Sequence, residues 1–428
     1  MNILSILLTI IKFILILSFL VLIHEGGHFL TAKAVGMKVD EFAIGFGPKI
    51  WSKKGKETMY SIRSIPLGGF VALAGEIGES DDPRAFANKP VWAKLLVVVM
   101  GATVNIVFAL VAIFFIVISQ GNSQTTTVSE VVENAPAYNA GIQAGDKIVS
   151  INGKKMRVQN DITEFLRKNK TEEVVVKVLR NGEHIDFNVV PQEERYGYTG
   201  IEFATDAENI YINEISGVQV DSPAKLAGLQ KGDKIISINN IETTNPSEIS
   251  YIAYENPDIS LPMVIDRNGE LINLTITPVC PELLVRYVLG FYGTKTSGAG
   301  ELIYTGFWEG IYQLRAMLSQ IFEIFTGQIS TKYLSGPIGI AKVVDQTTSW
   351  YDLLNLTVLI SMNLGIVNLL PIPPLDGGKI VLLIIEGIRK KPVSEKVEGA
   401  LQMLGFAFFI GLTIFVTFND IVRDLSIF

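Results

Sequence analysis

Three ionisable side chains, His24, Glu25 and His28, lie within five residues near the end of an apolar run. On a helix, the spacing H-E-x-x-H places both imidazoles on one face, one turn apart, where they can hold a zinc ion. Glu25 then lies on the adjacent side, where its carboxylate can act as a general base. The chain has only three histidines, and two of them fall in this motif. Chance, or a structural histidine pair in a helix bundle, therefore explains the motif poorly.

A catalytic zinc usually has three protein ligands and one open position, so a third ligand is needed. His184 follows an Asn-Gly turn and Cys280 ends a repeated segment; both are predicted to lie outside the membrane. Asp376, in "PIPPLDGG", is the clear candidate. Glu386 stands next to a basic loop and is expected to be solvated. Charged groups are costly inside a membrane unless they pair with one another. One zinc ion bound by His24, His28 and Asp376 would provide that pairing.

Four stretches are long and apolar enough to supply the spans that position these residues: 3–23 (or 3–34), 95–118, 353–385 and 400–418. The third is interrupted by "NLLPIPPLDGG". Such a break is tolerated at membrane depth only where it is buried in protein or lines a cavity. His24 and Asp376 lie a similar distance along the first and third stretches, which run in the same direction. We therefore expect them at the same depth.

The distribution of basic residues predicts the orientation. Residues 33–94 carry ten Lys and Arg side chains, and 388–399 carries four more, so both loops are predicted to be cytoplasmic. The segment 120–350 and both termini then lie outside, and the active site lies near the cytoplasmic side. We read the N-terminus as a retained span rather than a signal peptide. The net charge of −7 and the lack of a suitable basic block argue against nucleic-acid binding.

The outer segment contains a repeat with an offset of 87 residues. "APAYNAGIQAGDKIVSING" from 135 aligns with "SPAKLAGLQKGDKIISINN" from 222, and "RNGEHIDFNVVP" from 180 with "RNGELINLTITP" from 267. Each unit predicts a short helix, a Gly-Asp turn, a strand and an Asn-Gly hairpin. The pattern resembles PDZ domains of bacterial membrane and periplasmic proteases. Farther along, apolar residues at helical spacing in 307–325 predict either an interfacial amphipathic helix or a helix packed on a soluble domain.

"HEGGH" in a first span, "NLLPIPPLDGG" in a late span and PDZ-like units between spans two and three together resemble the site-2 protease family of intramembrane zinc metalloproteases. The tandem PDZ units resemble its regulator of sigma-E protease branch. The resemblance implies one zinc ion held by His24, His28 and Asp376, with Glu25 as general base. It also implies that Asn368 and Pro371 hold substrate backbone. "GFGPKIW" and "IPLGGFVALAG" match the family's membrane-reentrant β-hairpin. In "GATVN", Ala102 stands where many members have proline, so no role is carried over to Asn105.

The predicted fold is therefore a polytopic α-helical membrane protein of about four spans, with a membrane-associated β-hairpin and two tandem extracytoplasmic PDZ-like α+β domains. The predicted divisions are 1–34 (first span), 35–94 (cytoplasmic, reentrant β loop), 95–119 (second span), 120–200 and 201–283 (PDZ-like domains), 284–350 (linker with amphipathic helix), 351–387 (third span), 388–399 (cytoplasmic loop) and 400–428 (fourth span and outer tail).

The predicted function is zinc-dependent peptide-bond hydrolysis within the spans of single-span membrane proteins in the bacterial cytoplasmic membrane. The family resemblance implies anti-sigma factors and remnant signal peptides as substrates, first trimmed by an upstream site-1 protease. A membrane-tethered PDZ binding or chaperone module is the alternative. A metal transporter would need more polar residues along the spans than the sequence offers.

Overall fold

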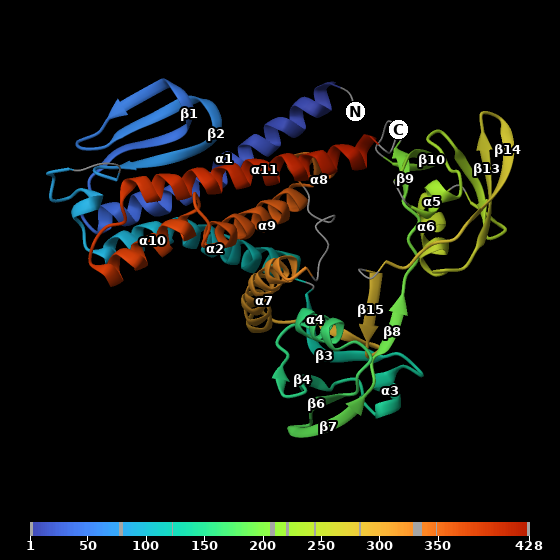
Figure 1. The fold of residues 1–428 in the computed structure, drawn as a ribbon. Helices are drawn as coiled ribbons and strands as arrows, with labels where there is room; N and C mark the ends of the chain where they lie inside the picture. Colours follow the sequence, from blue (N-terminus) through green and yellow to red (C-terminus); the bar gives the residue numbers. More distant parts are fainter. Residues whose placement is uncertain are drawn as a thin grey trace. The chain divides into compact units, whose positions relative to one another are not determined.

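The computed structural model describes residues 3–76, 80–121, 123–205, 210–219, 222–243, 245–281, 284–327, 336–347 and 349–425. It divides into two compact units (Figure 1). One comprises Met1–Gly121 and Gly298–Phe418 and is mainly helical; the other comprises Asn122–Ser297 and Asn419–Phe428 and is rich in strands.

Four helices in the described part of the chain are long and apolar enough to cross a membrane: α1 (Ile3–Ala34), α2 (Val91–Gln120), α9 (Trp350–Asn368) and α11 (Glu395–Leu425). The chain is therefore a polytopic membrane protein. The predicted stretch 353–385 is not one continuous helix, because α9 ends at Asn368 and α10 (Asp376–Arg389) begins eight residues later. The prolines between them cannot continue a helical hydrogen-bond ladder. The predicted interruption is confirmed, and α9 alone forms the span.

Glycines bring the spanning helices together. A Cβ atom at Gly27 of α1 would lie 2.6 Å from the carbonyl oxygen of Met100, and one at Gly365 of α9 would lie 2.9 Å from that of Ala102. Both distances are shorter than real Cβ contacts allow, so only glycine permits these backbones to approach α2 so closely.

The amphipathic segment forms α7 (Ala299–Phe325), and it packs against α2. Gly306 and Gly310 face Phe114 and Leu110 there. Neither alternative drawn from the sequence named a spanning helix as the partner of this segment. The short helix α8 (Pro337–Gln346) and the 3₁₀ turn Phe86–Asn88 complete the helical part.

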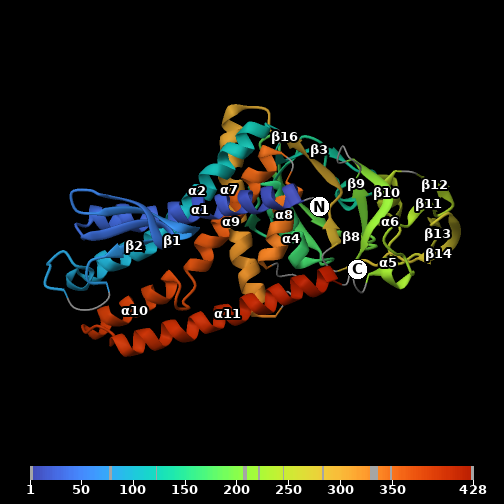
Figure 2. The same cartoon turned by 90° about the horizontal axis from the view of Figure 1, so that it is seen from above.

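The loop after α1 folds as the predicted hairpin of β1 (Val39–Lys54) and β2 (Met59–Leu73). Both strands bend, so that residues 41–44 pair with 59–62 on one side and with 69–72 on the other. Residues 69–73 thereby become an edge of the sheet. Figures 1 and 2 both place this sheet at the same end of the helical unit as α10.

The strand-rich unit contains two sheets of matching topology, with strand orders β16-β3-β4-β6-β7 and β9-β10-β11-β13-β14. Each has its own buried core, with Ile148 and Ile151 in the first matched by Ile235 and Ile238 in the second. The elements of the first are β3 (Gln124–Val131), α3 (Pro136–Ala140), β4 (Lys147–Ile151), β5 (Lys154–Lys155), α4 (Gln159–Asn169), β6 (Val174–Arg180), β7 (Glu183–Val189) and β16 (Phe291–Lys295). Those of the second are β9 (Ile201–Thr205), β10 (Tyr211–Val218), α5 (Pro223–Leu226), β11 (Lys234–Ile238), β12 (Ile241–Glu242), α6 (Pro246–Tyr254), β13 (Leu261–Arg267) and β14 (Glu270–Ile276).

One prediction about this unit is wrong. The predicted linker 284–350 begins with two strands instead: β15 (Val285–Val288) pairs with β8 (Gln192–Arg195), and β16 completes the first sheet beside β3. The counterpart of β9 one repeat earlier would be 114–118, and those residues belong to α2. Residues in a membrane helix cannot also form a strand. The edge strand of the first sheet is therefore β16, which follows the second repeat unit in the chain. Gly200 and Gly290, both at positive φ, precede the two equivalent strands.

Candidate metal centre

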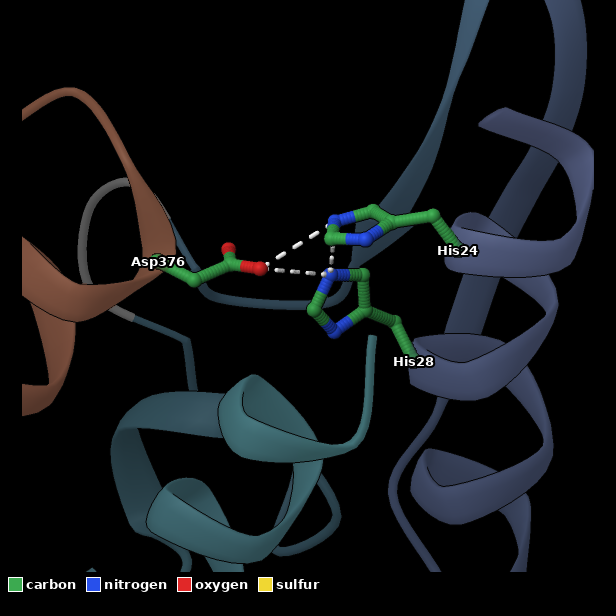
Figure 3. Close-up of side chains that lie close together, drawn as sticks. All are labelled: His24, His28 and Asp376. Atoms are coloured by element: carbon green, nitrogen blue, oxygen red, sulfur yellow. Dashed lines mark hydrogen bonds and ion pairs between the residues drawn. The ribbon is translucent and has the colours of Figure 1, made fainter. Parts of the chain in front are cut away.

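Two imidazoles and one carboxylate converge within the helical unit (Figure 3). His24 Nε2 lies 3.1 Å from His28 Nε2 and 3.1 Å from Asp376 Oδ2, and His28 Nε2 lies 3.4 Å from the same oxygen. The two histidines stand one turn apart on α1, as the sequence predicts, and Asp376 is the first residue of α10. Among the described residues, these three form the group of His, Cys, Asp or Glu side chains arranged to hold a metal ion.

The separations fit a single zinc ion. Tetrahedral zinc with bonds to nitrogen and oxygen near 2.1 Å separates its ligand atoms by about 3.3–3.4 Å. Asp376 Oδ2 is buried and has no hydrogen-bond partner of ordinary geometry among the described residues, although both Nε2 atoms are near it. Two imidazole nitrogens and a carboxylate oxygen at these distances are the donor set that a zinc ion between them would use. Three ligands also leave the fourth position open, as in catalytic zinc sites.

A hydrogen bond to α2 fixes the His28 imidazole on the side of the ring away from Asp376. Its Nδ1 lies 2.8 Å from the carbonyl oxygen of Val97 in α2. A carbonyl only accepts, so Nδ1 carries the proton and Nε2 keeps a free lone pair for a metal. Gly101, one turn farther along α2, makes room for the ring, because a Cβ atom at that position would collide with it. Neither Val97 nor Gly101 was predicted from the sequence as part of the site.

The turn before α10 delivers Asp376 to the site. A Cβ atom at Gly377 would collide with the carbonyl oxygen of Leu370, and one at Gly378 would lie 2.5 Å from the nitrogen of Pro373. The two glycines of "LDGG" therefore let the chain fold back on itself tightly enough to place the carboxylate opposite α1.

Glu25 lies beside the three converging side chains, as predicted. It lines, together with all three, a cavity of about 310 Å³. Its Cγ lies 3.6 Å from the position of a Cβ atom at Gly69 in β2, so it reaches the edge of the hairpin sheet. The remaining wall comes from β2, α2, the turn before α10, α10 and α11, through Phe70, Val71, Leu73, Glu76, Val97, Val98, Pro373, Pro374, Leu375, Lys379, Leu382, Glu398 and Gln402.

Asn368 and Pro371 do not line this cavity. Asn368 is the last residue of α9, and its amide Nδ2 lies 3.5 Å from His24 Nδ1, behind the ring. Asn105 is fully buried in α2, and its side-chain amide has no hydrogen-bond partner in the part of the chain that the structure describes.

Two ion pairs hold the helix that carries Asp376. Glu386 pairs with Lys94 of α2 at 2.8 Å, and both side chains are largely buried, so the expectation that Glu386 is solvated is wrong. Because the surroundings on α2 and α10 are apolar, removing either charge would leave the other buried without a partner, which is destabilising. Lys379 pairs with Glu76, which lies just beyond β2. His184 and Cys280, the rejected ligand candidates, lie in the other unit; His184 is exposed and Cys280 is a free thiol.

Comparison with known proteins agrees with this geometry. The family model described as "Peptidase family M50" matches residues 12–412. The chain belongs to peptidase family M50. It is 33% identical to "Zinc metalloprotease RasP" of Oceanobacillus iheyensis, 32% identical to "Probable protease eep" of Enterococcus faecalis and 30% identical to "Regulator of sigma-W protease RasP" of Bacillus subtilis. Each alignment covers 97% of this chain, and 99%, 99% and 98% of the respective relative.

Membership of the M50 family, together with the four helices long enough to span a membrane, makes this chain an intramembrane zinc metalloprotease of the site-2 type. Zinc is its cofactor. The prediction drawn from "HEGGH" and "NLLPIPPLDGG" is thus confirmed for the family, the enzyme class and the metal.

Proposed function

We propose that His24, His28 and Asp376 hold the single zinc ion of this M50 protease, and that Glu25 is its general base. The observation that carries the proposal is the convergence of the three ligand atoms at 3.1–3.4 Å in the cavity that Glu25 also lines. A zinc ion held by these three residues would supply Lewis-acid chemistry, which polarises a scissile carbonyl and makes water a nucleophile near neutral pH.

Glu25 performs the proton transfers. Its carboxylate takes a proton from the attacking water and passes it to the amine that leaves the cleaved bond. Its neighbour Gly69 keeps the hairpin backbone close, so the base stands between the zinc ligands and the sheet edge. Such a base contributes about 10²–10⁴-fold to the rate.

The substrate is presented as an extended strand. A transmembrane helix hides its amides in internal hydrogen bonds, so it must unwind locally before hydrolysis. Residues 69–73 offer a sheet edge beside the cavity, where an extended peptide can form backbone hydrogen bonds. Neither of the two residues that the family resemblance assigns to substrate lines the cavity; the proposed contact of Pro371, in the turn before Asp376, with substrate backbone rests on the resemblance alone.

The proposed substrates are single-span membrane proteins that have already lost their outer domain to a site-1 protease. The two sheets, proposed here as two extracytoplasmic PDZ-like domains, interrupt the chain between α2 and α7 and would exclude bulky outer domains. Anti-sigma-factor regulators and remnant signal peptides fit this description, and the name of the B. subtilis relative refers to regulation of a sigma factor. A recruiting role, in which a PDZ-like groove grips a newly exposed C-terminus, is the competing idea for these domains.

A comparison of membrane proteomes tests this order of events. Cells carrying Glu25→Gln should accumulate single-span fragments that lack their outer domains, because trimming proceeds and hydrolysis in the membrane does not. Accumulation of intact, untrimmed proteins would contradict prior trimming. A Glu25→Gln protein that retained full function would favour the alternative of a tethered PDZ binding or chaperone module.

A further inference from the structure

The two zinc-binding histidines of the proposed site present the same ring atom to the metal. Both turn Nε2 toward Asp376, so Nδ1 is the outer nitrogen of each ring. An imidazole that binds a metal through Nε2 carries its proton on Nδ1, and this N–H needs an acceptor that fixes the ring. His28 has such an acceptor in the carbonyl oxygen of Val97, at 2.8 Å.

The corresponding atom of His24 faces Asn368. The atom of the Asn368 amide that lies 3.5 Å from His24 Nδ1 is the nitrogen Nδ2, and Asn368 is partly buried at the end of α9. Asn368 is absent from the residues that line the cavity. Its side chain therefore lies behind the ring, on the side away from the cavity that receives substrate.

An asparagine amide has one end that accepts and one end that donates, and the hydrogen-bond network decides which end faces a partner. The nitrogen end would require His24 Nδ1 to accept, which would leave the proton on Nε2 and block the metal. The oxygen end accepts from Nδ1–H and leaves the Nε2 lone pair free.

We infer that Asn368 is a positioning residue for zinc, whose Oδ1 accepts a hydrogen bond from His24 Nδ1–H. This inference rests on the proposed zinc ligands. It assigns Asn368 to the metal rather than to substrate backbone. Although α9 supplies none of the proposed ligands, it would then contact the site directly. Both histidines come from α1; α2 orients His28 through Val97, and α9 orients His24 through Asn368.

Two substitutions at this position separate the two roles. Asn368→Leu keeps the volume and removes the acceptor, and the loss of a hydrogen bond to a metal-bound histidine typically weakens metal affinity by about 10–100-fold. Asn368→Asp keeps an acceptor oxygen and should bind zinc nearly as well as the wild type. Asn363→Leu, on an exposed position of the same helix, is the matched control and should leave zinc affinity unchanged.

The measurement is zinc affinity of the purified full-length chain in detergent, by competition with a chelator, and it needs no substrate. Unchanged zinc affinity in Asn368→Leu, with a raised KM for cleavage, would overturn the inference and return Asn368 to substrate binding. Loss of zinc by Asn368→Asp would also overturn it, even if Asn368→Leu failed to fold. If Asp376→Ala binds zinc normally, the proposed ligand set itself is wrong, which is a separate result.

Discussion

Gly26 and Gly27 stand between the two histidines, but only one of them lies against another helix. A Cβ atom at Gly27 would lie 2.6 Å from Met100 O, whereas one at Gly26 would meet nothing within 4 Å. We therefore expect Gly27→Ala to push α1 away from α2, to cost about 1–3 kcal/mol of stability as overpacking does, and to weaken zinc binding. Gly26→Ala should change neither thermal stability nor zinc affinity. Equal effects of the two substitutions would refute this account of the helix crossing.

The residues proposed to do the chemistry were predictable because their types are costly in a membrane. His24, Glu25 and His28 break an apolar run, and Asp376 follows a proline-rich break at a similar depth. The groups that hold them were not predictable from the sequence. Val97 acts through its backbone carbonyl, which carries no residue-type signal. Gly101 and Glu386 depend on which helix lies opposite, and only the packed structure specifies that.

At the scale of elements, one ion pair recurs in both sheets. Arg180 donates to Asp146 in the first and Arg267 to Asp233 in the second, with Nε–Oδ1 distances of 2.7 Å in each. Burial alone would raise the pKa of Asp146, but hydrogen bonds from Arg180 and from the backbone N–H of Gln143 outweigh burial and lower the pKa below its ordinary value. The ion pair joins the turn just before β4, which contains Asp146, to the last residue of β6, Arg180.

This lowered pKa has a defined consequence for stability. The pair contributes fully above the pKa of an unfolded aspartate, about 3.9, and the contribution disappears as pH falls through the lower folded pKa. Asp146→Asn should therefore destabilise the first sheet by about 1.5–3 kcal/mol at pH 6, and the difference from wild type should shrink near pH 3. Hydrogen exchange of the full chain in urea measures this.

The matched substitution Asp233→Asn should lower protection in the second sheet and leave the first unchanged. A wild-type advantage that persists undiminished at pH 3 would show that the ion pair is not its source.

The repeat shows what could and could not be predicted at this scale. The 87-residue offset correctly indicated two matching sheets, because turn and core residues recur in order. It could not reveal that β16 belongs to the first sheet, since the pairing of β16 with β3 joins residues at least 160 positions apart. The segment "VLGF", which ends at the first residue of β16, resembles "YTGI", which ends at the first residue of β9. This likeness was the sequence feature that could have indicated that β16 is equivalent to β9.

For the whole molecule, the untested prediction is orientation. Basic residues in 33–94 and in 388–399 predict that both segments lie on the cytoplasmic side. In a Cys280→Ser background, Asn240→Cys, in the exposed turn between β11 and β12, should react with a membrane-impermeant thiol reagent in intact spheroplasts. Lys54→Cys, at the exposed end of β1, should react only after the membrane is opened. The reverse pattern would place the metal site near the outer face.

The central claim is that His24, His28 and Asp376 together hold the zinc ion that this protease uses. The most direct test is the zinc content of the purified full-length Asp376→Ala chain, beside wild type and Glu25→Gln. We predict one zinc per chain in wild type and in Glu25→Gln, and a large loss in Asp376→Ala while the protein still inserts in the membrane. Full zinc occupancy in Asp376→Ala would contradict the account.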